Sequence, residues 1–218
     1  MPLWLMVNRE ALRKRSRRRL YIAGGVVAIA LLTVGGVWAV FLNNNTAPAC
    51  TPTSKLTCAR IETSLGTFEV ELYKSATPAT VANFVSLSKA GFYNHLVWHR
   101  IVAGFVIQTG DATTKNGGGD RSTWGNYQGT LIPFEYNSTI HNRVGYLGMA
   151  STAAKAGGST QFYINLVNNP NLDSKYAVFG KVVSGMDVVQ AIGRVQVNGQ
   201  DQPVDPVYVT AVTISEVA

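Results

Sequence analysis

Short runs of β-branched and aromatic residues, separated by turns rich in glycine, asparagine and serine, recur along most of this chain. After a turn at 64–67, apolar residues alternate with glutamates over 68–72. Further runs lie at 97–101, 105–109, 146–149, 162–165, 178–182 and 207–214. Short runs of this composition between turn signals are typical of β-strands. We therefore expect a chain dominated by short strands.

Two segments have the spacing and the boundary residues of helices. Thr77 and Pro78 supply an N-cap and a first-turn proline, apolar residues follow at helical spacing from Val81, and Gly91 ends the segment. A second short helix is expected at 186–192. Many short strands with two helices favour a mostly β fold, in which an antiparallel sheet closes or nearly closes into a barrel.

The formal net charge of +7 comes almost entirely from the N-terminus. Residues 1–19 hold six arginines and one lysine against a single glutamate, whereas 12 basic and 11 acidic residues follow residue 42. The larger part of the chain therefore lacks the basic surface of a nucleic-acid-binding protein, and no nucleic-acid partner is expected. A nucleic-acid-binding arm at 1–19 is the alternative.

Residues 20–42 form an uncharged, apolar run of 23 residues. This length is enough for a helix to cross a hydrocarbon core of about 30 Å, so we predict a single transmembrane helix in contact with membrane lipid. The basic residues at 1–19 are expected to stay in the cytoplasm, which places the rest of the chain on the extracytoplasmic side of the cell membrane. The alternatives are a buried core helix and a signal peptide cleaved near 47–49.

Residues 43–58 are small, polar and proline-bearing, as in a linker, and a single domain is expected at 59–218. Cys50 and Cys58 are the two cysteines; in an oxidising compartment they could form a disulfide, and two free thiols are the alternative. His95, His99 and His141 show no clustered metal-ligand spacing. No metal and no cofactor are expected.

The stretch from Trp98 to Asp111 combines basic, aromatic and amide side chains. Alternation puts Arg100 on one face of a first strand, while Phe105 and Gln108 follow a turn at 103–104. Such a hairpin could arrange a guanidinium, a phenyl ring and a carboxamide around one shallow pocket. The alternative is that Arg100 pairs with a carboxylate on the surface.

The same stretch resembles the signature of the cyclophilins, a family of peptidyl-prolyl cis-trans isomerases. Two further blocks follow in the order of the family, one at 145–165 and one at 172–189. The resemblance covers roughly residues 60 to 216, and together with the predicted transmembrane helix it suggests a membrane-anchored bacterial form.

This resemblance implies an eight-stranded antiparallel barrel capped by two helices, and catalysis of rotation about X-Pro peptide bonds. Arg100 matches the catalytic arginine of the family. The remaining positions that match substrate-binding residues are His99, Phe105, Val106, Gln108, Ala150, Ser151, Gln161, Tyr163, Leu172 and Tyr176. Tyr163 stands where better-known members carry phenylalanine, which predicts an extra hydroxyl on the pocket floor.

The expected substrates are proline-containing polypeptides, and assistance to the folding of exported proteins is the expected role of a monomeric enzyme. The competing hypothesis is a non-catalytic module that binds proline-containing segments of partner proteins. A hydrolase is unsupported because the chain has no Gly-x-Ser-x-Gly motif.

Overall fold

A computed structural model describes residues 50–53 and 56–217. The predicted cytoplasmic segment (1–19) and transmembrane helix (20–42) lie outside these residues. Within the described part of the chain, no helix combines the length and the apolar character that a membrane span requires.

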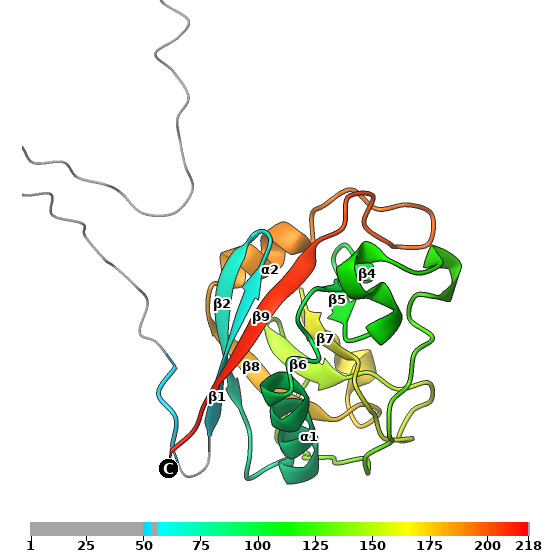
Figure 1. Cartoon of the computed structure of the whole chain (residues 1–218). Helices are drawn as coiled ribbons and strands as arrows, with labels where there is room; N and C mark the ends of the chain where they lie inside the picture. The colour runs from blue at the N-terminus through cyan, green and yellow to red at the C-terminus, as the bar shows by residue number, and fades with distance from the viewer. Residues whose placement is uncertain (1–49, 54–55, 218) are drawn as a thin grey trace, which may run out of the picture. The chain divides into compact units, whose positions relative to one another are not determined.

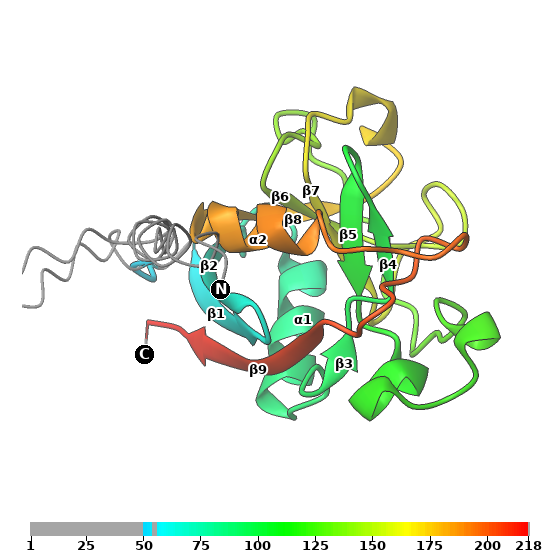
Figure 2. The same ribbon diagram turned by 90° about the horizontal axis from the view of Figure 1, so that it is seen from above.

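The described residues form one curled antiparallel sheet of nine strands (Figures 1 and 2). Their order across the sheet is β3-β9-β1-β2-β8-β6-β7-β5-β4. The strands are β1 (Thr57–Thr63), β2 (Gly66–Leu72), β3 (Leu96–Val97), β4 (Arg100–Val102), β5 (Val106–Thr109), β6 (Tyr146–Met149), β7 (Phe162–Asn165), β8 (Val178–Ser184) and β9 (Tyr208–Ser215). The predicted mostly β fold is confirmed.

The expectation of eight strands in a barrel is wrong, because β1 precedes the first predicted run and the run at 97–101 is divided between two strands. β3 pairs with β9, whereas β4 pairs with β5. Trp98 and His99 pass between the two, and the Trp98 backbone N–H donates to the carbonyl of Val207. The two edge strands of the sheet are therefore neighbours along the chain, joined by two residues.

Two α-helices accompany the sheet, as predicted, and Figure 1 shows them at opposite ends of it. α1 (Pro78–Lys89) contacts β9, and α2 (Met186–Ile192) contacts β2. Three short 3₁₀ helices lie in the connections: η1 (Ala112–Gly117), η2 (Arg121–Thr123) and η3 (Pro170–Leu172).

Aromatic rings fill the concave side of the curled sheet. Phe162 meets Phe84 of α1 and Trp98 edge-on, with ring centroids 5.4 and 5.9 Å apart. Side chains along β7 point alternately to the two sides of the sheet. Phe162 and Ile164 belong to the hydrophobic core, whereas Tyr163 and Asn165 do not. The same alternation turns the second set of side chains toward the convex side of the sheet.

The segment before β2 contains a strand that the sequence pattern did not reveal. β1 begins at Thr57, so the last two residues of the predicted linker (43–58) already belong to the sheet. Cys50 and Cys58 form a disulfide, and the Cys50 backbone N–H donates to Glu69 on β2. The chain that enters the domain is thus fixed to its first hairpin.

The N-terminus of α1 is capped by a residue far away in the sequence. Thr77 occupies the predicted N-cap position, but its side chain makes no capping bond. Glu135 takes this role: its carboxylate accepts from the backbone N–H groups of Ala79 (3.0 Å) and Thr80 (2.8 Å) and from the Thr80 hydroxyl (2.8 Å). A carboxylate also interacts favourably with the positive end of the helix dipole.

We expect Glu135→Ala to lower the free energy of unfolding by about 2 kcal/mol, because it removes a charged cap from three donors. Glu135→Gln keeps an acceptor and should cost less. Urea denaturation measures both, with Glu62→Ala as the control because Glu62 only pairs with Arg60 at the surface. Equal stability of Glu135→Ala and the wild type would show that the carboxylate does not support the helix.

Candidate active site

A row of four side-chain positions crosses the convex side of β4, β5, β7 and β6. The strand register pairs Arg100 with Gln108, Gln108 with Tyr163, and Tyr163 with Gly148. Directly opposed residues of antiparallel strands lie about 5 Å apart on the same face of the sheet. The sheet therefore presents a guanidinium, a carboxamide and a phenol ring side by side, and the fourth position carries no side chain.

A pocket of about 250 Å³ opens beside this row. Nine of the predicted site residues line it: Arg100, Phe105, Val106, Gln108, Ala150, Ser151, Tyr163, Leu172 and Tyr176. They come from three separate parts of the sequence, and the strand order brings these parts together. Gln161 and His99, the two remaining predictions, do not line this pocket.

The Arg100 guanidinium lies over the Phe105 ring, with Cζ 6.0 Å from the ring centroid. In the described part of the chain, no carboxylate or other acceptor binds this guanidinium. The alternative of a surface ion pair for Arg100 thus finds no partner among these residues. A permanently charged donor at the pocket rim therefore remains available to a bound molecule.

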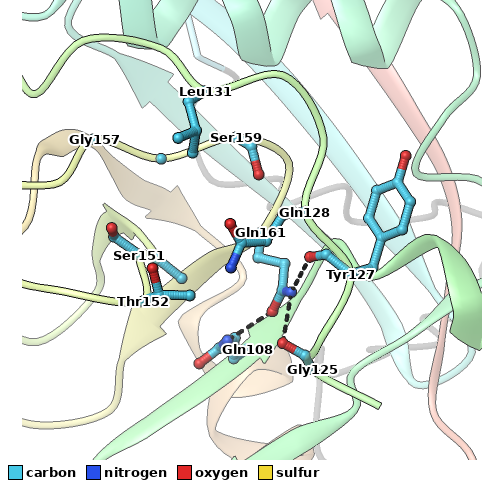
Figure 3. Close-up of a pocket in the computed structure, with 12 residues that line it drawn as sticks. Gln108, Gly125, Tyr127, Gln128, Leu131, Ser151, Thr152, Gly157, Ser159 and Gln161 are labelled. Atoms are coloured by element: carbon cyan, nitrogen blue, oxygen red, sulfur yellow. Dashed lines mark hydrogen bonds between the residues drawn. The ribbon is translucent and has the colours of Figure 1, made fainter. Parts of the chain in front are cut away.

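Gln108 is oriented by a chain of amide hydrogen bonds, drawn as dashed lines in Figure 3. Gln161 Nε2 donates to the backbone carbonyls of Gly125 (3.0 Å) and Tyr127 (2.7 Å). Its Oε1 therefore faces Gln108 and accepts from Gln108 Nε2 at 2.9 Å. No donor within the described ranges binds Gln108 Oε1, which can therefore accept a hydrogen bond at the pocket.

Gln161 lines a second pocket of about 150 Å³, which shares Gln108, Ala150 and Ser151 with the first (Figure 3). The residues that sequence reasoning missed belong to its loops: Gly125, Tyr127, Gln128, Leu131, Thr152, Gly157, Gly158 and Ser159. These loops have no apolar periodicity, so spacing alone offered no signal for them.

His99 is buried and does not form part of the pocket rim. Its side chain is only 2% exposed, and a side chain at Gly125 would lie 3.7 Å from the imidazole. Burial lowers the pKa of His99 to about 4. Among the described residues, neither ring nitrogen has a hydrogen-bond partner. His99, predicted among the substrate-binding residues, therefore does not reach the pocket, because the loop around Gly125 covers it.

Tyr163 forms the floor of the pocket, but its hydroxyl is directed elsewhere. The hydroxyl donates to Oδ1 of Asn142 at 2.7 Å, in a fully buried contact. The Tyr176 ring stands perpendicular to the Tyr163 ring, at a centroid distance of 6.1 Å. The extra polar group expected on the pocket floor is thus bound behind it.

Comparison with known proteins agrees with this arrangement. The family model described as cyclophilin type peptidyl-prolyl cis-trans isomerase/CLD matches residues 58–214. Peptidyl-prolyl cis-trans isomerase-like 1 of Aspergillus oryzae is 40% identical over 156 residues, which are 71% of this chain and 93% of that protein. The human peptidylprolyl isomerase domain and WD repeat-containing protein 1 is 42% identical over 158 residues, 72% of this chain and 24% of that protein.

Two solved structures are also similar. The crystal structure of a Cryptosporidium parvum cyclophilin type peptidyl-prolyl cis-trans isomerase has a TM-score of 0.65 and 28% identity, and covers 75% of this chain and 99% of that one. A second structure with the same description, in the presence of the dipeptide Ala-Pro, has a TM-score of 0.64 and 29% identity, with coverages of 73% and 99%.

Proposed function

This chain belongs to the cyclophilin-type peptidyl-prolyl cis-trans isomerase family, and from this premise we propose that the pocket beside Arg100 binds a proline ring while Arg100 assists rotation of the preceding peptide bond. The observation that carries the proposal is a guanidinium that has no acceptor within residues 50–53 and 56–217 and lies at the rim of a pocket lined by Phe105, Tyr163 and Leu172.

The chemical task is to weaken the partial double bond between carbon and nitrogen. Rotation about an X-Pro bond meets a barrier of about 20 kcal/mol because amide resonance resists it. A hydrogen bond donated to the proline nitrogen stabilises the pyramidal nitrogen of the twisted state and so weakens the resonance. The Arg100 guanidinium can donate this bond without any proton transfer, since it remains charged at every relevant pH.

The remaining pocket residues hold the substrate during rotation. The apolar walls bury the proline ring and so fix one side of the bond that turns. Gln108 Oε1 accepts from a backbone N–H of the substrate, because its Nε2 is already bound by Gln161. Ala150 and Ser151 line both pockets, which suits a peptide chain that extends from one to the other.

The experiment that tests this function is exchange NMR on an X-Pro peptide mixed with the full chain. Peptide signals that exchange between cis and trans faster than the uncatalysed rate, together with chemical-shift changes at Arg100 and Phe105, are expected. Shift changes at the same residues with an unaltered exchange rate would favour the non-catalytic binding module. Catalysis without any shift at these residues would place the activity outside this pocket.

We further propose that residues 20–42 anchor the protein in a cell membrane and that its substrates are exported proteins. The uncharged run at 20–42 and the basic residues at 1–19 support this proposal. The fungal and human relatives lend no support to a bacterial source, which stays a prediction. Resistance of the full chain to alkaline extraction from membranes, lost on deletion of 20–42, is expected; extraction of the intact chain would contradict the anchor.

A further inference from the structure

The fourth position of the cross-strand row explains where the Tyr163 ring lies. A Cβ atom at Gly148 would lie 2.1 Å from Cζ and 2.2 Å from the hydroxyl oxygen of Tyr163, far inside contact distance. The ring therefore leans across the glycine, away from Gln108 on its other side. Because the ring occupies the space over β6, room for the pocket remains between it and Arg100.

The Tyr163 ring is held in this position by its hydroxyl. Burial raises the pKa of Tyr163, so the hydroxyl stays protonated and can donate. The residue is 4% exposed, and Oδ1 of Asn142 accepts from it at 2.7 Å. If this acceptor were removed, the buried hydroxyl would lose its hydrogen bond and still lack contact with water, which is unfavourable. Rotation of the ring toward the open pocket would relieve that cost.

Asn142 is itself fixed by four further hydrogen bonds. Its backbone N–H (2.7 Å) and its Nδ2 (3.0 Å) both donate to the Asp173 carboxylate. Asn165 Nδ2 donates to Oδ1 (3.2 Å), and the Asn169 N–H donates to the backbone carbonyl (2.7 Å). With Nδ2 bound to a carboxylate, the amide oxygen has to face Tyr163. Asn142 is 1% exposed and does not line the pocket.

We propose that Asn142 is a positioning residue of the isomerase, which keeps the proline pocket open by holding the Tyr163 hydroxyl behind the pocket floor. Asp173 directly follows Leu172, a pocket wall, so Asn142 ties that wall to the floor. The inference rests on the proposed function of the pocket. The tyrosine then acts in the pocket as an apolar ring.

A double-mutant cycle tests this role, with kcat/KM for an X-Pro peptide measured for the wild type, Asn142→Ala, Tyr163→Phe and the double variant. We expect Asn142→Ala to lower kcat/KM about tenfold when Tyr163 is unchanged. When Tyr163→Phe is also present, the same substitution should lower kcat/KM by less than about twofold. Tyr163→Phe alone gives the reference activity of the hydroxyl-free background, in which no hydroxyl needs a partner. Asn168→Ala is the matched control, since Asn168 accepts from the backbone of Val144 instead.

Equal losses from Asn142→Ala in both backgrounds would overturn the proposal and leave Asn142 a purely structural residue. Thermal unfolding of each variant shows whether it is folded. A second measurement needs no variant: the Tyr163 hydroxyl proton in the wild type should exchange slowly with solvent by NMR, and fast exchange would contradict the anchor. If the wild type proves inactive, the proposed function fails, and peptide affinity in the same cycle still tests the role of Asn142.

Discussion

Arg100→Lys is expected to lower kcat/KM about 10²- to 10³-fold, because the reaction depends on the geometry of the donor and not on charge alone. Lysine keeps the positive charge but replaces the planar fork with a compact ammonium group on a flexible stem. The contact of the guanidinium with the Phe105 ring, which orients it at the rim, is also lost. A donor that is not held toward the proline nitrogen forms only a weak hydrogen bond when that nitrogen becomes pyramidal, and it therefore stabilises the twisted state little.

Exchange NMR at several peptide concentrations separates the effect on turnover from the effect on affinity. We expect the loss to fall mainly on kcat, since the apolar pocket that binds the ring is unchanged. Arg121→Lys is the matched control: Arg121 also lies over an aromatic ring, that of Trp124 at 4.9 Å, but it lines neither pocket. Full activity of Arg100→Lys would mean that a simple positive charge suffices and that our mechanism is incorrect.

The stability of the folded protein is expected to fall by about 3 kcal/mol as the pH drops from about 6.5 to about 4, because His99 must then gain a proton in the unfolded chain but not in the core. Its folded pKa lies below its unfolded value, so the unfolded state binds more protons in this window. The contribution of neutral His99 to the free energy of unfolding is complete above pH 6.5 and is lost as the pH falls toward 4.

Urea denaturation at several pH values between 7 and about 4 measures this slope, and His99→Gln should remove it. His141→Gln is the control, because His141 is partly exposed and pairs with Asp173. Burial would raise the pKa of Asp173, but hydrogen bonds from Asn142 and pairing with His141 outweigh it and lower the pKa, so this carboxylate loses its contribution only below the window. An unchanged slope in His99→Gln would show that other groups cause the pH dependence.

The sequence was sufficient to predict most residues that line the pocket, but not the residues that hold these elements and side chains in place. Arg100, Phe105 and Tyr163 could be assigned because strand alternation and the resemblance to cyclophilins act on short stretches of chain. The cap of α1 could not, because Glu135 lies 55 residues from Thr80 and no local pattern links them. Asn142 was missed for the same reason, since its role depends on a hydrogen bond from Tyr163 on β7 to a loop residue 21 positions earlier in the chain.

Two predictions were wrong because of the segment between β3 and β4: the single strand at 97–101 and the place of His99 at the pocket. The sequence pattern predicts one strand at 97–101, and the resemblance to cyclophilins implies that His99 binds substrate. Neither contains information on which strands this segment will pair with. Val97 pairs with β9 and Arg100 with β5, on opposite edges of the sheet. The side chains of Trp98 and His99 are both buried where these edges meet. Pairing between distant strands, and not local preference, decides this break.

The position of Arg100 on an edge strand also bears on when the enzyme becomes active during its own folding. Strands β5, β7 and β6, with the pocket residues Gln108 and Tyr163, could assemble while the other half of the sheet is still unformed. Only two residues, however, separate Arg100 from the end of β3, and β3 pairs with β9. Contacts between parts so distant in sequence form slowly. Catalytic activity should therefore appear late, as a signal that the last strand of the chain has docked.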